Sequence, residues 1–349
     1  MKLKKRLHLS TSQTVAMLLT ALTIAFLVFS ACSDEDKGSS AGETSTSTKS
    51  SSSDSKYDSL KGEVRIDGSS TVFPISEAVA EEFSKVSRVR VNVAFSRTGG
   101  GFEKFCRGET HISDASRAMK DKEVVACAEK GINDVIELEV AIDALTVMIN
   151  PENTWAQCMT VKELNYAFHA GGAKKWSDIR SDWPNKDIVA FYPGVDSGTF
   201  DYFNEIIIEE FEKEKEHTHR ADGTPSEDDN VLALGIASDP YAIGYFGFAY
   251  YVGAGSELTA VQIDNGDGCI EPTFENALSG TYTPLSRPLY IYTRASLLDN
   301  PAVYGFLEYY LNNLGELVPD VGYITMPKDR EAIMVSRLTE RIVTHGSEQ

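Results

Sequence analysis

Short apolar runs alternate with amphipathic stretches along the chain from about residue 62 onward. Residues 64–66 predict a short strand, and residues 88–94 place Val89, Val91 and Val93 at alternate positions, as in a half-buried strand. Between these two strands, a helix is expected to begin near Pro74 with its apolar side chains on one face. Further strands are expected at 136–140, 145–149, 188–192, 241–252, 258–263 and 288–293.

Helical patterns separate these strands. They cover residues 121–130 and 161–168, a short segment that Gly108 ends, a long segment from Ser197 through Ile207, and two segments after the last strand. No internal repeat is present in the sequence. Alternation of strand and helix predicts an α/β fold with mostly parallel sheets and right-handed crossovers.

The first residues have the pattern of an export signal rather than of the fold. A basic start is followed by an apolar run that is short for a membrane span, so residues 1–31 are predicted to be a cleaved signal peptide. The run ends in Phe-Ser-Ala before Cys32, which is similar to a bacterial lipoprotein signal with Cys32 as the lipidated residue. The alternative is an ordinary secretory peptide that leaves Cys32 as a free thiol.

Residues 32–61 are mainly Ser, Thr, Gly and charged side chains, which predicts a flexible tether between a lipid anchor and the folded body. The body contains an even number of cysteines, which in an exported chain predicts two disulfides. The pairing expected is Cys106–Cys127 and Cys158–Cys269, since the first pair is local and the second stays within one half of the chain. A metal site is the alternative, but no C-x-x-C motif or close Cys/His grouping favours it.

The net charge of −19 argues against nucleic acid as a partner. Removal of residues 1–31 takes away four positive side chains and no acidic one, which leaves −23. The electrostatic field of a protein with this negative charge repels anions. Any anion site in this chain therefore depends on hydrogen-bond donors that act over a few ångströms.

Three segments have a composition that suits such a site. Each places Ser, Thr and Gly directly after a strand and at the start of a helix: Ser69-Ser70-Thr71, Thr98-Gly99-Gly100 and Ser197-Gly198-Thr199. Helix N-termini present unpaired N–H groups to an oxyanion, hydroxyls add donors, and Gly allows close approach. Each segment could equally be a helix cap or a turn. A fourth segment, Ser113 to Arg117, adds a guanidinium that could bind two oxygens or serve as a surface ion-pair partner.

These segments carry a resemblance to a known family. Residues 66–83 (IDGSSTVFPISEAVAEEF) resemble the start of periplasmic phosphate-binding proteins of phosphate ABC transporters. The resemblance continues in chain order through TGGGF at 98–102, ISDASR at 112–117, DSGTF at 196–200, SEDDN at 226–230 and PLSRP at 284–288.

The resemblance implies a type II periplasmic-binding-protein fold, in which two α/β lobes close on the ligand in a cleft. Lobe 1 would comprise residues 62–142 and 288–349, and lobe 2 residues 143–287. The phosphate contacts it implies are Ser69, Ser70, Thr71, Ser96, Thr98, Gly99, Ser116, Arg117, Asp196, Ser197, Gly198 and Thr199.

The chain departs from the family pattern at three points. Pro193-Gly194-Val195 stands where the best-known branch has an Arg, so Arg117, or less plausibly Arg220, is expected to supply the guanidinium. The carboxylate that accepts the proton of monohydrogen phosphate is also open, with Asp196 and Asp114 as candidates. Arg97 replaces a residue that is usually Gly and would add a second cation at the mouth.

The expected function is therefore capture of inorganic phosphate outside the cytoplasm and its delivery to the membrane permease, by a monomer that needs no cofactor or metal and is not an enzyme. A phosphatase would need a nucleophile beside a base or a metal cluster, and no His lies near the three Ser/Thr/Gly segments in the sequence. A binding protein for sulfate, molybdate or arsenate, or a phosphate sensor without transport, remains an alternative.

Overall fold

The computed structural model describes residues 56–345, apart from 196, 210, 212, 249 and 252–256. The predicted signal peptide, Cys32 and nearly all of the tether lie outside these residues. No helix of the described part is long and apolar enough to cross a membrane.

The strands lie mainly in one sheet, with the order β2-β1-β3-β12-β4-β8-β6-β7 and with β9 beside β4. A small second sheet has the order β11-β10-β5. The strands are β1 (Lys61–Gly68), β2 (Arg88–Phe95), β3 (Ile112–Ala115), β4 (Val135–Ile149), β5 (Cys158–Thr160), β6 (Val189–Pro193), β7 (Thr224–Ser226), β8 (Ala242–Gly247), β9 (Thr259–Ala260), β10 (Gln262–Asp264), β11 (Cys269–Ile270) and β12 (Ser286–Arg294).

The helices agree with most of the predicted segments. They are α1 (Phe73–Val86), α2 (Arg97–Cys106), α3 (Asp121–Ala128), α4 (Val161–Phe168), α5 (Trp176–Ile179), α6 (Gly198–Phe203), α7 (Asp229–Ser238), α9 (Phe274–Leu278), α10 (Pro301–Asp320) and α11 (Lys328–Thr339). The π-helical turn η2 (Asn204–Glu209) continues α6, and η3 (Lys213–Lys215) and η4 (Ala295–Asp299) are short 3-10 turns.

The centre of the main sheet differs from the prediction. The outer pairs β2–β1, β1–β3, β8–β6 and β6–β7 are parallel, but β12 is antiparallel to both β3 and β4, and β4 is antiparallel to β8. The expectation of mostly parallel sheets is thus wrong at the centre. Strands 136–140 and 145–149 are one strand, β4, because the polar Asp143 between them keeps its place in the ladder opposite Arg287 of β12.

Two other predicted strands are shorter or divided. The predicted strand 241–252 ends at Gly247 as β8. The predicted strand 258–263 is two strands, since β9 pairs with β4 and β10 pairs with β5.

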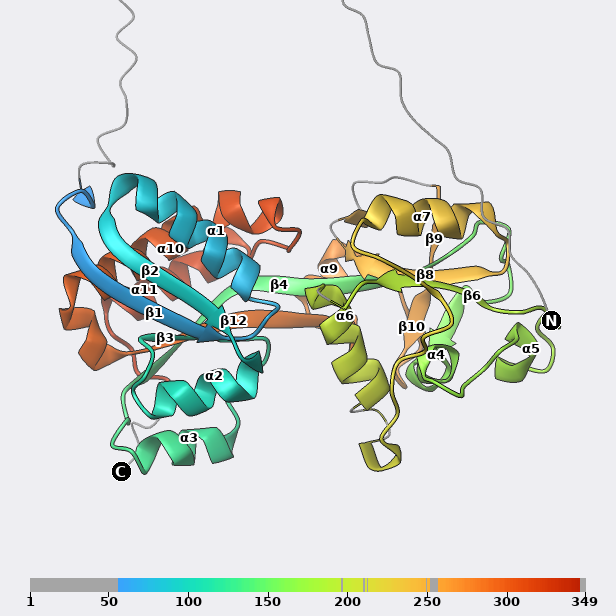
Figure 1. Ribbon diagram of the computed structural model, residues 1–349, viewed down its shortest axis with the longest axis horizontal. Coiled ribbons are helices and arrows are strands. Elements are labelled where there is room, and N and C mark those ends of the chain that lie inside the picture. Colours follow the sequence, from blue (N-terminus) through green and yellow to red (C-terminus); the bar gives the residue numbers. More distant parts are fainter. Residues whose placement is uncertain are drawn as a thin grey trace, which may run out of the picture. The chain divides into compact units, whose positions relative to one another are not determined.

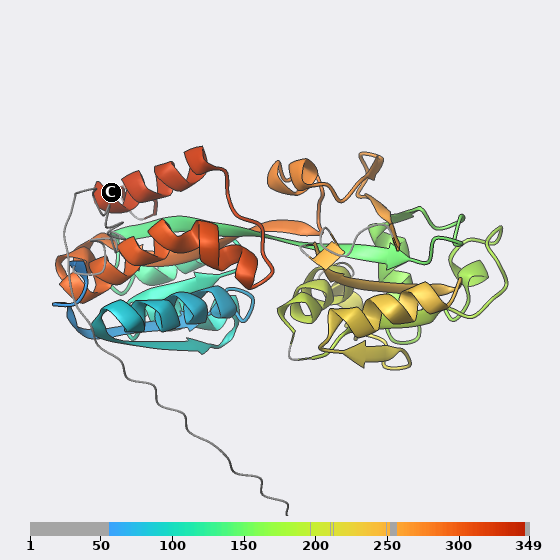
Figure 2. The same cartoon turned by 90° about the horizontal axis from the view of Figure 1, so that it is seen from above.

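Strand β12 runs beside residues 135–144 of β4 (Figure 1). The first part of β4 pairs with β12 near β3, and its last five residues pair with β8. The largest apolar core combines residues between 57 and 141 with residues between 289 and 338, and the next core lies wholly between residues 145 and 285. Figure 2 shows β4 and β12 leading from the elements around the largest core to those around the second core.

Helices cover both faces of the sheet formed by β1, β2 and β3 (Figure 1). Helices α1, α10 and α11 pack on one face through apolar residues such as Phe83, Phe306 and Leu338. Helices α2 and α3 pack on the other face around Phe102 and Phe105. Loops that leave β1 and β2 therefore enter α1 and α2 at the same end of the sheet, which is where ligands bind in open α/β sheets.

Both predicted disulfides are confirmed. Cys106 at the end of α2 is bonded to Cys127 in α3, and Cys158 in β5 is bonded to Cys269 in β11. The first bond holds the two helices of one face together, and the second closes the small sheet.

Candidate functional site

The loop between β1 and α1 carries the first hydroxyl segment. The backbone N–H of Ser69 donates to the Asp114 carbonyl of β3 at 2.9 Å, and the Thr71 N–H donates to Ser69 Oγ at 3.1 Å. No side chain caps the start of α1. The N–H groups of its first turn are nevertheless occupied: Phe73 donates to the Ser69 carbonyl, Ile75 and Ser76 donate to the Val72 carbonyl, and Pro74 has no N–H. This segment therefore offers an anion its hydroxyl groups rather than the N–H groups of the first helical turn.

The loop between β2 and α2 carries the second segment. Thr98 Oγ1 lies 3.0 Å from Ser116 Oγ and accepts a hydrogen bond from the Ser116 N–H at 3.1 Å. Ser96 Oγ donates to Asp67, and again no side chain caps the helix. Hydroxyls from two loops and a second uncapped helix N-terminus thus meet at one end of the sheet.

The third segment is different, because Ser197 does cap its helix. Ser197 Oγ accepts from the Thr199 N–H at 3.2 Å at the start of α6. A Cβ placed on Gly198 would lie 3.4 Å from Thr71 Cα and 3.4 Å from Tyr323 Oη, so the segment packs directly against the first hydroxyl loop. Its neighbour Asp196, a predicted ligand, lies outside the described residues.

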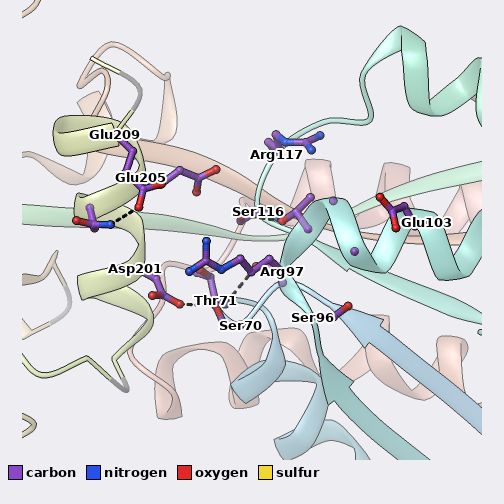
Figure 3. Close-up of a pocket in the computed structure, with 15 residues that line it drawn as sticks. Ser70, Thr71, Ser96, Arg97, Glu103, Ser116, Arg117, Asp201, Glu205 and Glu209 are labelled. Atoms are coloured by element: carbon purple, nitrogen blue, oxygen red, sulfur yellow. Dashed lines mark hydrogen bonds between the residues drawn. The ribbon is translucent and has the colours of Figure 1, made fainter. Parts of the chain in front are cut away.

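These loops surround a cavity of about 450 Å³. Figure 3 shows its hydroxyl side chains and the start of α2 facing the helical segment α6–η2. Of the predicted contacts, Ser69, Ser70, Thr71, Ser96, Thr98, Gly99, Ser116 and Arg117 line it. Ser197, Gly198 and Thr199 are not among the lining residues. The remaining lining residues are Arg97, Gly100, Glu103, Asp201, Asn204, Glu205 and Glu209.

The acidic side chains of the α6–η2 segment were not singled out from the sequence. Asp201 Oδ2 accepts a hydrogen bond from Ser70 Oγ at 2.7 Å, and Glu209 accepts from Asn204 at 2.6 Å. Asp201, Glu205 and Glu209 follow Ser-Gly-Thr at four-residue intervals, and this helical spacing was the signal that could have identified them.

The two arginines proposed from the sequence have different positions. Arg117 lies at the edge of the cavity (Figure 3). Its Nη1 and Nη2 each donate to a Glu123 oxygen at 2.8 Å. Arg220 does not line the cavity; it is buried elsewhere, bonded to Asp222 and to the Ala167 carbonyl. Arg220 is therefore not brought to the site.

A third arginine, Arg287 of the PLSRP segment, stands directly behind the first hydroxyl loop. Its Nη2 donates to Thr71 Oγ1 at 3.1 Å, Nη1 donates to Glu205 at 3.1 Å, and Nε donates to Asp143 at 3.3 Å. The guanidinium carbon lies 3.5 Å from the centre of the Tyr202 ring, and only 12% of the side chain is exposed. The sequence alone assigns Arg287 no role, because only the fold brings β12 to residue 71.

The carboxyl of Asp114 does not face the cavity. It is buried beneath the loops, where Oδ1 accepts from Ser76 Oγ at 3.0 Å and Oδ2 has no hydrogen-bond partner among the described residues. Burial raises the pKa of Asp114 to about 8, repulsion from Asp67 adds to this, and the Ser76 hydrogen bond opposes it. The structure therefore argues against Asp114 as the acceptor of a ligand proton.

Burial also raises the pKa of Asp143 to about 6, although the neighbouring Arg287 favours the charged form. Asp143 thus remains largely ionised at neutral pH and pairs with Arg287 on the two central strands. Among the described residues, no group of three or more His, Cys, Asp or Glu side chains could hold a metal ion.

The chain resembles known proteins over most of its length. Residues 39–313 match the profile of the PBP superfamily domain. The protein SphX of Synechocystis is 42% identical over 76% of this chain and 79% of its own length. The phosphate-binding protein PstS of Staphylococcus saprophyticus is 36% identical over 81% of this chain and 86% of its own length.

A solved structure leads to the same result. The crystal structure described as a possible phosphate binding protein from Planctomyces limnophilus superposes with a TM-score of 0.77 and is 46% identical, covering 81% of this chain and all of that one. The expectation of a two-lobe type II fold is thereby confirmed. The chain belongs to the PBP superfamily, in the family of periplasmic phosphate-binding proteins.

Proposed function

We propose that this protein captures inorganic phosphate in the cavity described above and passes it to the permease of an ABC transporter. The observation that carries the proposal is the convergence of Ser70, Thr71, Thr98 and Ser116 with the uncapped N-terminus of α2 on one small cavity. Neutral donors of this kind can hold a dianion inside a protein whose overall charge is strongly negative. The relatives named as phosphate-binding proteins support phosphate as the anion.

The arginines have separate roles in this proposal. Arg117 is the predicted direct ligand, since it lines the cavity and can release Glu123 to bind two phosphate oxygens. Arg287 is a positioning residue. Because its Nη2–H occupies a lone pair of Thr71 Oγ1, the Thr71 hydroxyl is left to donate its own proton toward the ligand.

Asp201 is the carboxylate best placed to accept the proton of monohydrogen phosphate. It lines the cavity and already accepts from Ser70, whereas Asp114 is buried away from it. Sulfate has no proton to donate, so its oxygen would face a carboxylate without a hydrogen bond. Asp201 would therefore favour phosphate over sulfate.

The remaining sequence predictions complete the proposal. Residues 62–142 with 288–349 would form one lobe and residues 143–287 the other, and the composition of the two largest apolar cores supports this division. The protein would act as a monomer outside the cytoplasm, held to the membrane by a lipid on Cys32. It would act as a binding protein and not an enzyme, as the names of its relatives suggest.

Titration calorimetry with the purified protein tests the proposed ligand. We expect phosphate to bind with one site per chain and sulfate to compete poorly. Equal binding of the two anions, or of neither, would overturn the proposal.

A second titration tests the role of Asp201. In Asp201→Asn, the ratio of sulfate to phosphate affinity should rise by roughly 10- to 100-fold, since the unfavourable carboxylate is removed and the proton acceptor is lost. Glu209→Gln is the matched control, because Glu209 also lines the cavity but bonds Asn204 instead of a hydroxyl. An unchanged ratio in Asp201→Asn would show that another group accepts the proton.

A further inference from the structure

The backbone of Arg97 has an unusual conformation. Its φ angle is 65°, in the left-handed region where a Cβ is unfavourable and Gly is the usual residue. Arg97 is the first residue of α2 and lies directly between Ser96 and Thr98 of the second hydroxyl loop. A strained residue that persists at a binding cavity suggests that its side chain has a function there.

The side chain of Arg97 is placed to perform such a function. It lines the cavity and extends from the start of α2 toward the segment that carries Asp201 and Glu205 (Figure 3). Arg117, the other arginine among the lining residues, is held by Glu123. Arg97 has no ion pair or side-chain hydrogen bond with any residue of the described part of the chain, so its five N–H donors face the cavity without a carboxylate partner.

The cavity presents an incoming anion with an electrostatic problem. Its wall includes Glu103, Asp201, Glu205 and Glu209, and the whole chain carries a charge of −19. Neutral hydroxyl and N–H donors act only at short range, whereas an exposed guanidinium attracts an anion over about a Debye length, roughly 10 Å at 0.1 M salt.

We infer that Arg97 is the capture residue of this site: its guanidinium draws the phosphate dianion past the acidic wall and then binds it at the mouth of the cavity. The inference rests on the proposed function. It also explains why a position whose backbone suits Gly carries Arg in this chain, since a Gly there would relieve the backbone but leave the mouth with acidic side chains.

The test compares Arg97→Gly with Arg341→Gly. Arg341 is also an arginine in left-handed backbone, with φ of 55°, but it pairs with Asp299 and does not line the cavity. Both variants remove one positive charge and gain the residue that the backbone favours, so both should fold. Only the position of the lost charge differs.

We expect Arg97→Gly to weaken phosphate binding roughly tenfold at low ionic strength and clearly less at high salt, as measured by calorimetry over a series of salt concentrations. Arg341→Gly should keep the wild-type affinity and salt dependence, and Arg97→Lys should recover most of the loss. If Arg97→Gly binds phosphate like the wild type at every ionic strength, the inference is wrong while the proposed function stands. If the wild type itself does not bind phosphate, the proposed function fails.

Discussion

Gly101→Ala should destabilise the folded protein by about 3 kcal/mol or more and abolish tight phosphate binding. A Cβ at this position would lie 2.4 Å from Gly68 Cα, 2.9 Å from the Asp67 carbonyl oxygen and 2.9 Å from Ser113 Oγ. Two of these three atoms belong to the backbone at the end of β1, so no side-chain rotation can remove the clash. Helix α2 would have to move away from the sheet, and Thr98 at its start would move with it.

Gly99→Ala is the matched control for this prediction. A Cβ on Gly99 meets no heavy atom within 4 Å, although Gly99 lines the cavity. The variant should unfold at the same denaturant concentration as the wild type and differ from it only in phosphate affinity. Chemical denaturation and calorimetry measure the two effects separately. Equal denaturation midpoints for Gly101→Ala and the wild type would contradict the packing argument.

Asp114→Asn should change how stability depends on pH. Burial raises the pKa of Asp114 to about 8 in the folded protein, well above the ordinary value of 3.8 for an aspartate. Between these two values the folded state holds a proton that the unfolded state has released, so the free energy of unfolding falls as the pH rises from about 4 through about 8. The loss should total several kcal/mol, roughly 5 to 6 if the whole shift is realised.

The Asn variant mimics the protonated carboxyl and cannot lose its proton, so it should lack this part of the decline. Measurement of the free energy of unfolding at pH 5, 7 and 9 checks this, with the exposed Asp187→Asn as the control for the loss of one acidic residue. At pH 9 the Asn variant should be the more stable protein. Parallel curves for the wild type and Asp114→Asn would show that the carboxyl ionises in the fold without penalty.

Most of the secondary structure could be predicted because it depends on local patterns. Alternating valines in β2 and the apolar face of α1 are properties of residues close together in the chain. The prediction failed at residues 141–144, which it left between two strands although they belong to β4. The ion pair with Arg287 on the neighbouring strand keeps Asp143 buried within β4, and residues 144 positions apart do not reveal this in a local pattern.

The same distinction between local pattern and distant contact applies to the binding site. By itself, the sequence determined the chemistry of the loops: hydroxyl and Gly residues at the starts of α1 and α2, both disulfides, and the family resemblance that identifies phosphate as the expected anion. These features depend on residue type and on short-range order along the chain, which a sequence states directly.

Only the tertiary structure decided which charged groups accompany the hydroxyls. It placed Arg287 behind Thr71, brought Asp201 to Ser70, turned Asp114 away from the cavity and left Arg97 facing it. Ser70 and Asp201 are 131 residues apart, and Thr71 and Arg287 are 216 apart. Charges act through space over a few ångströms, so their partners are fixed by the packing of distant strands and helices and not by spacing along the chain.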